Sequence, residues 1–396
     1  MIFTIAGLVV AILGLPTVWL ALRAHRSAKN AAEFDKVRQY VRSHQPELYS
    51  IALAGSSQSW IDSGIPLLVK DGWLLKTPRS LDCISLKLVE SDVPSIGAQP
   101  EASSRAPLHG MRVSYSDALA TRPEGEGLFN GALYRPIQVE GTRGGLRITC
   151  TKGFYFDYLD NGEALAFEAG ARLLKGKAPL AGPRRKAVAD PFDLSLRPTS
   201  LGVNTLTIRK GVNGEVGFYM HKRSGSHVVN EEDQVGLAPA GEFTPSDISY
   251  EAMKADFSVW RNIMREYAEE FLGVPESRGR GGRTLDYEND APFAELSAAR
   301  DCGALNVWTF GVAIDPLCFK PELLTVCIFA ADAFDEIFAD MTSSNDEGTL
   351  LVGPSRHGIP FTGQNVKLYA DNEGTSLAAA ASLTLTWRHR KRLGLA

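Results

Sequence analysis

The hydrophobic pattern of the chain begins with an uncharged run over residues 2–22. In a helix, these 21 residues cover about 30 Å, which is the thickness of the hydrocarbon layer of a membrane. Trp19 lies near the end of the run, and the cations Arg23, Arg26 and Lys29 follow it. The pattern therefore predicts a single transmembrane helix, and the positive-inside rule places the N-terminus outside and the body in the cytoplasm.

A cleaved signal peptide is the alternative for this run, but it requires a basic stretch before the apolar residues. Only Met1 precedes them, and Arg23 follows directly. Within the run, Gly7, Ala11 and Gly14 share one helix face, and small residues on one face let membrane helices approach closely. Glycine and alanine are also common in membrane helices, so this face indicates either helix packing or ordinary membrane composition.

The rest of the chain is long enough for two units, because 396 residues exceed the roughly 250–300 at which one core stops growing. Residues 31–42 and 164–174 have helical patterns, and residues 66–69 and 84–89 are strand-like. The Gly-, Pro- and Arg-rich stretch at 175–191 is the best candidate boundary. We therefore expect an anchor with its basic flank at 1–30, an α+β domain at 31–190 and a second domain at 191–396.

The pattern of the second domain is clearer. Two strand-like runs flank Asn213-Gly214, which is a strong hairpin signal. A long helical stretch follows at 250–272. Further strands are expected at 235–243, 307–314 and 323–329, and helices at 333–341, 363–370 and 376–390. Antiparallel strands mixed with helices predict an α+β fold in layers.

The helical stretch at 250–272 carries the most informative side chains. Its aromatic and Met residues recur every three or four positions and form one apolar stripe. Glu266, Glu269 and Glu270 lie to one side of it at spacings that let their carboxylates converge. Gly273 and Pro275 end the helix. A divalent cation would compensate the three charges, but intrahelical pairs with arginines or an ordinary solvated acidic face are alternatives.

The segment Arg265-Glu266-Tyr267-Ala268-Glu269-Glu270-Phe271-Leu272-Gly273 resembles the second half of the Nudix box, R-E-U-x-E-E-x-G-U. The resemblance implies a Nudix-like αβα domain over about residues 200–390, Mg²⁺ as a cofactor held by Glu266, Glu269 and Glu270, and a structural role for Arg265. One extra residue separates Glu270 from Gly273. The first half of the box, a glycine followed after five residues by a glutamate, would fall on Glu251 and Phe257 and does not match.

Ala240-Gly241-Glu242 is the nearest substitute for the missing first half of the box. We include Glu242 and Arg265 among the expected ligand-binding residues. The glycine-rich stretch after the box helix contributes three more, because glycines admit a phosphate to the backbone and arginines pair with it. Those three are Arg278, Arg280 and Arg283. A flexible surface loop is the alternative for this stretch.

A transmembrane helix before a Nudix-like domain resembles the membrane-anchored effectors of cyclic-oligonucleotide-based anti-phage signalling in bacteria. That resemblance implies an inner-membrane protein that binds a cyclic oligonucleotide, self-associates as a homo-oligomer and disrupts the lipid bilayer. A membrane-bound Nudix hydrolase of a diphosphate-linked nucleotide and a non-catalytic regulatory protein are the alternatives. The net charge of -4 argues against binding of a DNA or RNA duplex. The five cysteines have no metal-site or disulfide spacing.

Overall fold

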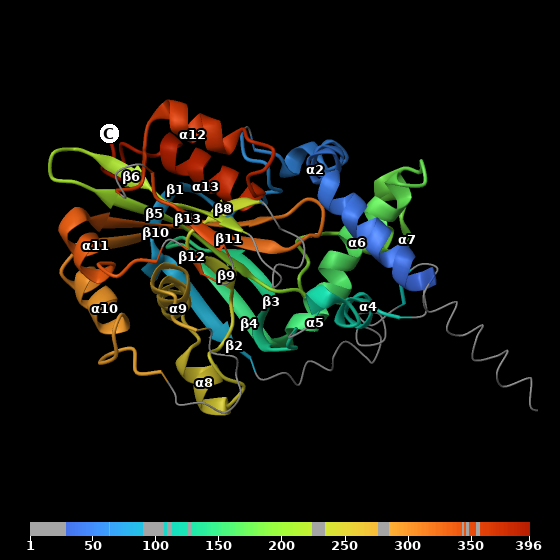
Figure 1. Ribbon diagram of the computed structural model, residues 1–396, viewed down its shortest axis with the longest axis horizontal. Coiled ribbons are helices and arrows are strands. Elements are labelled where there is room, and N and C mark those ends of the chain that lie inside the picture. The colour runs from blue at the N-terminus through green and yellow to red at the C-terminus, as the bar shows by residue number, and fades with distance from the viewer. Residues whose placement is uncertain are drawn as a thin grey trace, which may run out of the picture.

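The computed structural model describes residues 29–62, 64–89, 107–108, 113–125, 128–223, 234–275, 285–342, 344–345, 348–353 and 357–396. These residues form a mixed α/β body in which one large sheet lies between layers of helices (Figure 1). A third helical layer lies at one end of the sheet.

The large sheet has seven described strands in the order β1-β10-β11-β5-β6-β14, with β9 also pairing with β5. Its central pair, β11 and β5, is parallel, and all its other pairs are antiparallel. The strands are β1 (Leu74–Ser80), β5 (Gly202–Lys210), β6 (Val216–Phe218), β9 (Ala240–Glu242), β10 (Leu305–Ile314), β11 (Pro321–Ala330) and β14 (Ile359–Pro360).

Helices cover both faces of this sheet because its central strands are apolar on both sides. Along β11, Leu324 and Val326 join the core under α13 (Leu377–Arg388) and α12 (Gly363–Ala370). The alternating residues Leu323, Cys327 and Phe329 join the core under the opposite layer. That layer contains α9 (Val259–Leu272), α10 (Phe293–Asp301) and α11 (Ala331–Ile337). The second half of the chain is therefore an αβα sandwich (Figure 1).

Two smaller sheets and the end layer complete the described body. One small sheet contains β12 (Ser344–Asn345), β13 (Gly348–Leu351), β7 (Met220–Arg223) and β8 (Val235–Leu237), and the other contains β2 (Ile84–Leu88), β4 (Leu146–Phe154) and β3 (Ala132–Gly141). The end layer has a helix at 29–43, α2 (Gln45–Ala54), α4 (Tyr115–Ala120), α5 (Tyr155–Tyr158), α6 (Ala164–Leu173) and α7 (Pro183–Ala187). Single 3₁₀ turns occur at Gln58–Trp60, Leu81–Cys83, Pro123–Gly125 and Pro179–Ala181, and a π-helical turn at Leu159–Glu163 joins α5 to α6. In the core of the end layer, Phe34 stacks on Phe167, and Tyr115 packs edge-on against both rings.

Several predicted elements are present in the structure. The hairpin around Asn213-Gly214 is β5 and β6, and Gly214 has the left-handed φ of 83° that the turn requires. The expected helix at 250–272 is two helices, α8 (Tyr250–Ala255) and α9, because the buried Asp256 binds Ser246 and Ser258 caps α9. The expected strand at 66–69 forms only isolated bridges at Leu68.

The two halves of the predicted domain division are joined by shared structure. The strand β1 belongs to the first half of the chain and pairs with β10 of the second. One hydrophobic core contains Tyr134 and Ile148 together with Val203 and Tyr267. The stretch at 175–191 contains α7 and a tight turn. The boundary itself stays a prediction.

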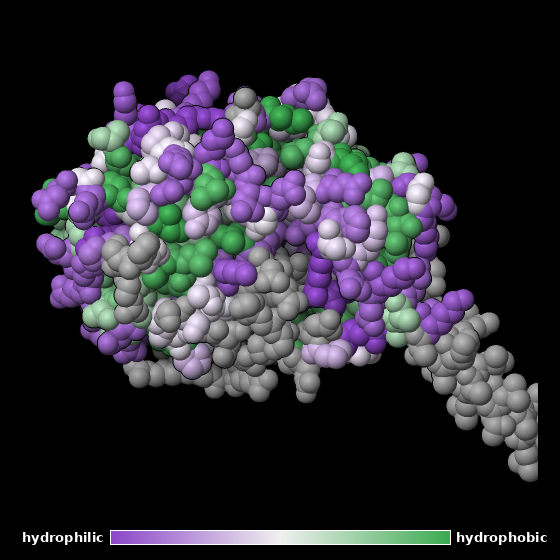
Figure 2. Space-filling model, turned by 45° about the horizontal axis from the view of Figure 1, so that its top comes forward, coloured by the Kyte–Doolittle hydropathy of each residue, from purple (hydrophilic) through white to green (hydrophobic). Residues whose placement is uncertain are grey.

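The membrane prediction requires correction. Among the described residues, no helix is long and apolar enough to cross a membrane. The helix α9 has 14 residues, whereas a span needs about 20 apolar ones, and hydrophilic side chains are spread over the visible face of the body (Figure 2). The predicted anchor at 2–22, with Gly7, Ala11 and Gly14, lies outside the described residues. We therefore withdraw the transmembrane helix from the fold class, and with it the inner-membrane location and the bilayer as a partner.

Gly273 ends α9 in the left-handed conformation, with φ 67°, and the N–H of Val274 closes the turn onto the carbonyl of Ala268 at 3.0 Å. A Cβ at Gly273 would meet no clash but would have to adopt this conformation. We expect Gly273→Ala to lower the free energy of unfolding by about 1 kcal/mol, measured by urea denaturation. Gly144→Ala is the control, since Gly144 has ordinary φ and open space around it. Equal effects of the two substitutions would contradict the assignment.

Candidate functional site

The helix α9 is held firmly against the sheet. Its buried stripe of Ile263, Tyr267 and Phe271 faces β5 and α11. The hydroxyl groups of Tyr267 and Thr207 lie 2.7 Å apart, which ties the helix to β5. The ring of Phe271 packs against Phe338 with 5.0 Å between centroids. This packing fixes the orientation of α9, and with it the direction of the side chains outside the buried stripe.

Arg265 lies inside the protein, with 5% of its surface exposed. Its guanidinium donates to the hydroxyl of Tyr287 at 2.7 Å and to the carbonyl of Thr244. Tyr287 donates in turn to the carboxylate of Asp256 at 2.8 Å, and Asp256 is fully buried. Although burial alone would lower the pKa of Arg265, Tyr287 and Asp256 raise it. Through these contacts, Arg265 stabilises the junction between α8 and α9.

Glu270 also points into the protein and is 3% exposed. One of its carboxylate oxygens accepts a hydrogen bond from the backbone N–H of Ala240 at 2.9 Å. The other lies 3.9 Å from Nδ1 of His221, which is on β7 and is 2% exposed. Glu270 therefore connects α9 to β9 and to the small sheet.

Glu266 and Glu269 lie on the half-exposed side of α9. The carboxylate of Glu266 lies directly over the backbone of Gly241, where an added Cβ would be 2.2 Å from Oε1. The amide of Asn262 lies 3.4 Å from the same oxygen. The structure thus brings Ala240-Gly241 next to α9, and a side chain at position 241 would require the carboxylate of Glu266 to move.

The described residues contain no group of three or more His, Cys, Asp or Glu side chains arranged to hold a metal ion. On α9, Glu270 does not join the other two glutamates in such a group, because its carboxylate contacts Ala240 and His221 inside the protein. Glu266 and Glu269 fit a metal better, since both are half-exposed and lie one helical turn apart. The structure therefore separates the three predicted ligands into one internal and two half-exposed residues.

Glu242 does not join the carboxylates of α9, although it follows Gly241 in sequence. Successive side chains of a strand point to opposite faces, and Glu242 points to the face opposite α9. There its carboxylate pairs with Nζ of Lys320 at 2.6 Å. Lys320 also lies 3.5 Å from Glu322, which accepts a hydrogen bond from the amide of Asn204 at 2.7 Å. Burial raises the pKa of Glu322 to about 7 although Lys320 opposes it, and Glu242 adds to the increase.

The polar cluster of Glu242, Lys320 and Glu322 was not predicted from the sequence. Its members come from two strands and the turn between β10 and β11, and they meet through the register of β5 with β9 and β11. One signal was present: Glu322 is a carboxylate inside the otherwise apolar run of β11. A charged residue in a strand that is buried on both faces indicates a paired or functional group.

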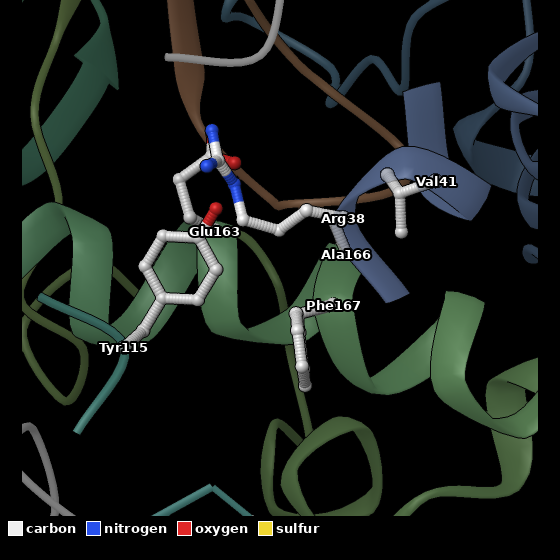
Figure 3. A pocket seen from close by; sticks show the side chains of 6 residues that line it. All are labelled: Arg38, Val41, Tyr115, Glu163, Ala166 and Phe167. Carbon is white, nitrogen blue, oxygen red and sulfur yellow. The ribbon is translucent and has the colours of Figure 1, made fainter. Parts of the chain in front are cut away.

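A small cavity of about 10 Å³ lies in the end layer and is lined by Arg38, Tyr115 and Glu163 among others. The ends of the Arg38 and Glu163 side chains lie side by side there (Figure 3). Glu163 accepts a hydrogen bond from the hydroxyl of Tyr158 at 2.6 Å. The cavity has room for about one water molecule, so it is too small for a nucleotide.

Arg278, Arg280 and Arg283 lie outside the described residues. Their expected contact with phosphate stays a prediction. Of the other expected ligand-binding residues, Arg265 is internal and Glu242 is paired on the far face of the sheet. No protein-family model matches this chain, and no curated protein matches it.

Proposed function

We propose that α9 and β9 form a Nudix-like site that binds a phosphate-bearing nucleotide and senses it without hydrolysing it. The observation that carries the proposal is the carboxylate of Glu266 over the bare backbone of Gly241. In the Nudix box, a glycine-bearing strand and loop lead into a helix whose glutamates bind magnesium, and this chain has both parts side by side. The αβα sandwich with its parallel central pair agrees with the same proposal.

Magnesium would be held by Glu266 and Glu269. Mg²⁺ in nucleotide sites is usually bound by one or two carboxylates together with phosphate oxygens and water. Two half-exposed glutamates are therefore enough when the ligand brings its own phosphates. The ion would neutralise the ligand's charge next to the acidic helix.

Glu270 is the reason for proposing binding without hydrolysis. The Nudix resemblance assigns it to the metal, but here its oxygens face Ala240 and His221 inside the protein. Freeing the side chain would break its hydrogen bond with the N–H of Ala240, at a cost of about 0.5–1.5 kcal/mol. The upstream glutamate of the box is also absent. With only two carboxylates available to the metal, we expect the site to bind the phosphate of a ligand without activating a water molecule to cleave it.

The ligand class in this proposal is a nucleotide with a phosphodiester or diphosphate group, and cyclic oligonucleotides are the first to test. Binding would favour a homo-oligomer only if the assembled state binds the ligand better than the free chain does. This part of the proposal rests on the Nudix-like resemblance of α9 alone.

The test is calorimetric titration of the full chain with cyclic di- and trinucleotides and with ADP-ribose, with and without Mg²⁺. We expect Mg²⁺-dependent binding that weakens about 10–100-fold in the double variant Glu266→Gln and Glu269→Gln, as loss of metal-site groups does. Glu251→Gln is the matched control, because Glu251 is exposed on the neighbouring helix α8. It should bind as the parent does.

Three results would contradict the proposal. Binding that is equally strong in the double variant would remove α9 from the site. If the chain hydrolyses ADP-ribose with Mg²⁺ and Glu270→Gln abolishes this activity, the protein is a diphosphate hydrolase, which is the second candidate function. A chain that binds no nucleotide would favour a regulatory interaction protein.

A further inference from the structure

Three arginines from separate segments meet beside the turn between β10 and β11. Arg135 belongs to β3, Arg185 to α7, and Arg197 to the segment that leads into β5. The guanidinium carbons of Arg185 and Arg197 lie 3.7 and 5.9 Å from the ring centroid of Phe319. Arg135 donates to the carbonyl of Ser195, two residues before Arg197. Arg185 and Arg197 therefore meet at Phe319, and Arg135 contacts the segment that carries Arg197.

None of these arginines forms an ion pair with a carboxylate of the described residues. Their hydrogen bonds go to backbone carbonyls: Arg185 to Pro316 and Leu317, and Arg197 to Pro191 and Phe319. Other buried or half-buried arginines of this chain do have partners, as Arg209 has Asp335. In this respect the cluster differs from Arg209.

Arg197 has the strongest unmet requirement. It is 5% exposed, and its Nε and Nη1 atoms are buried with no hydrogen-bond partner within the part of the chain that the structure describes. The Nε atom of Arg135 is buried and lacks such a partner in the same way. Removing a cation from water costs several kcal/mol unless a counter-charge compensates it.

The groups that act on Arg197 itself do not supply that counter-charge. Burial raises the pKa of the Cys318 thiol and of the Tyr158 hydroxyl well above their usual values, so both stay neutral. Carboxylates act instead on the other two arginines: burial lowers the pKa of Arg185 and of Arg135, while Asp315 and Glu168 oppose this at Arg185 and Asp157 opposes it at Arg135. Burial lowers the pKa of Arg197 to about 10, and Arg135 and Arg185 act in the same direction. An added anion would reverse this repulsion.

We propose that Arg135, Arg185 and Arg197 hold a small oxyanion of the phosphate class. Guanidinium groups match the geometry of phosphate oxygens, and the N–H groups of Arg197 and Arg135 supply donors for it. Phosphate could be free or carried on a ligand, and the two have the same chemistry at this site. The site lies away from α9, so the inference is independent of the proposed nucleotide sensing.

The test is calorimetric titration of the full chain with inorganic phosphate in a buffer that contains a metal chelator. A titration with chloride at the same ionic strength is the blank. We expect saturable binding that weakens at least about tenfold in both Arg197→Met and Arg135→Met. Arg135→Met keeps the inference testable if Arg197→Met fails to fold. Arg135 is half-exposed and its side chain donates to the carbonyl of Ser195, so we expect its replacement to leave the fold intact. Arg209→Met is the control and should bind phosphate as the parent does.

Absence of saturable phosphate binding by the parent would overturn the inference. So would unchanged binding in Arg135→Met and, if it folds, Arg197→Met, or an equal loss in Arg209→Met. A second titration with AMP identifies the source of the anion. Tighter binding of AMP that depends on the same arginines supports a phosphate carried on a ligand, whereas tighter binding of inorganic phosphate supports the free ion.

Discussion

Replacement of Arg265 by Met is expected to lower the free energy of unfolding by about 3–5 kcal/mol. The substitution keeps the apolar stem but removes the cation whose Nη1 lies 3.9 Å from the fully buried carboxylate of Asp256. The hydroxyl of Tyr287 and the carbonyl of Thr244 would lose a donor at the same time. Urea denaturation of the variant and parent measures the loss.

Arg261→Met on the same helix is the matched control. Arg261 is half-exposed, donates to the carbonyl of Ala255 and lies 4.8 Å from the ring of Tyr287, with no buried carboxylate depending on it. We expect a loss of about 1 kcal/mol there. A small effect of Arg265→Met, no larger than that of the control, would contradict the internal role of Arg265.

Replacement of Glu322 by Gln is expected to remove a pH dependence of stability. The pKa of Glu322 is raised from 4.5 to about 7 in the folded chain, so the folded state binds this proton more tightly than the unfolded state. Stability from this group is therefore full below about pH 4.5 and is lost as the pH rises through about 7. At about 1.4 kcal/mol per pKa unit, the loss is about 3 kcal/mol.

The measurement is the free energy of unfolding between these two pH values for the parent and for Glu322→Gln. The parent should lose stability as the pH rises relative to the variant, which keeps an acceptor for Asn204 and leaves Lys320 with Glu242. Glu288→Gln, at an exposed position, is the control and should follow the parent. Parallel pH profiles of parent and Glu322→Gln would refute the assignment.

The elements of the second half could be predicted well because local signals agree with the packing. Asn213-Gly214 gives the turn of β5 and β6, Gly273 gives the end of α9, and the apolar run of β11 marks a strand buried on both faces. The split between α8 and α9 could not be predicted, because it depends on the long-range bonds of Asp256 to Ser246 and Tyr287.

The candidate site could be predicted in part. The helical pattern around the glutamates located α9, and Gly241 lies against this helix in the structure. What spacing could not provide is direction: Glu270 points inward to Ala240, and Glu242 points to the other face of its strand. The cluster around Arg197 could not be predicted, because Arg135 comes long before it in the sequence and Phe319 lies 122 residues after it.

Crystals of the chain with a bound nucleotide and Mn²⁺, used in place of Mg²⁺, would show whether Glu266 and Glu269 hold the ion. Anomalous scattering locates the ion independently of the protein. The account predicts a single strong peak between the carboxylates of Glu266 and Glu269, beside Gly241, with ligand phosphate completing the coordination. A nucleotide bound elsewhere, or an ion that takes Glu270 as a ligand with the nucleotide cleaved, would contradict it.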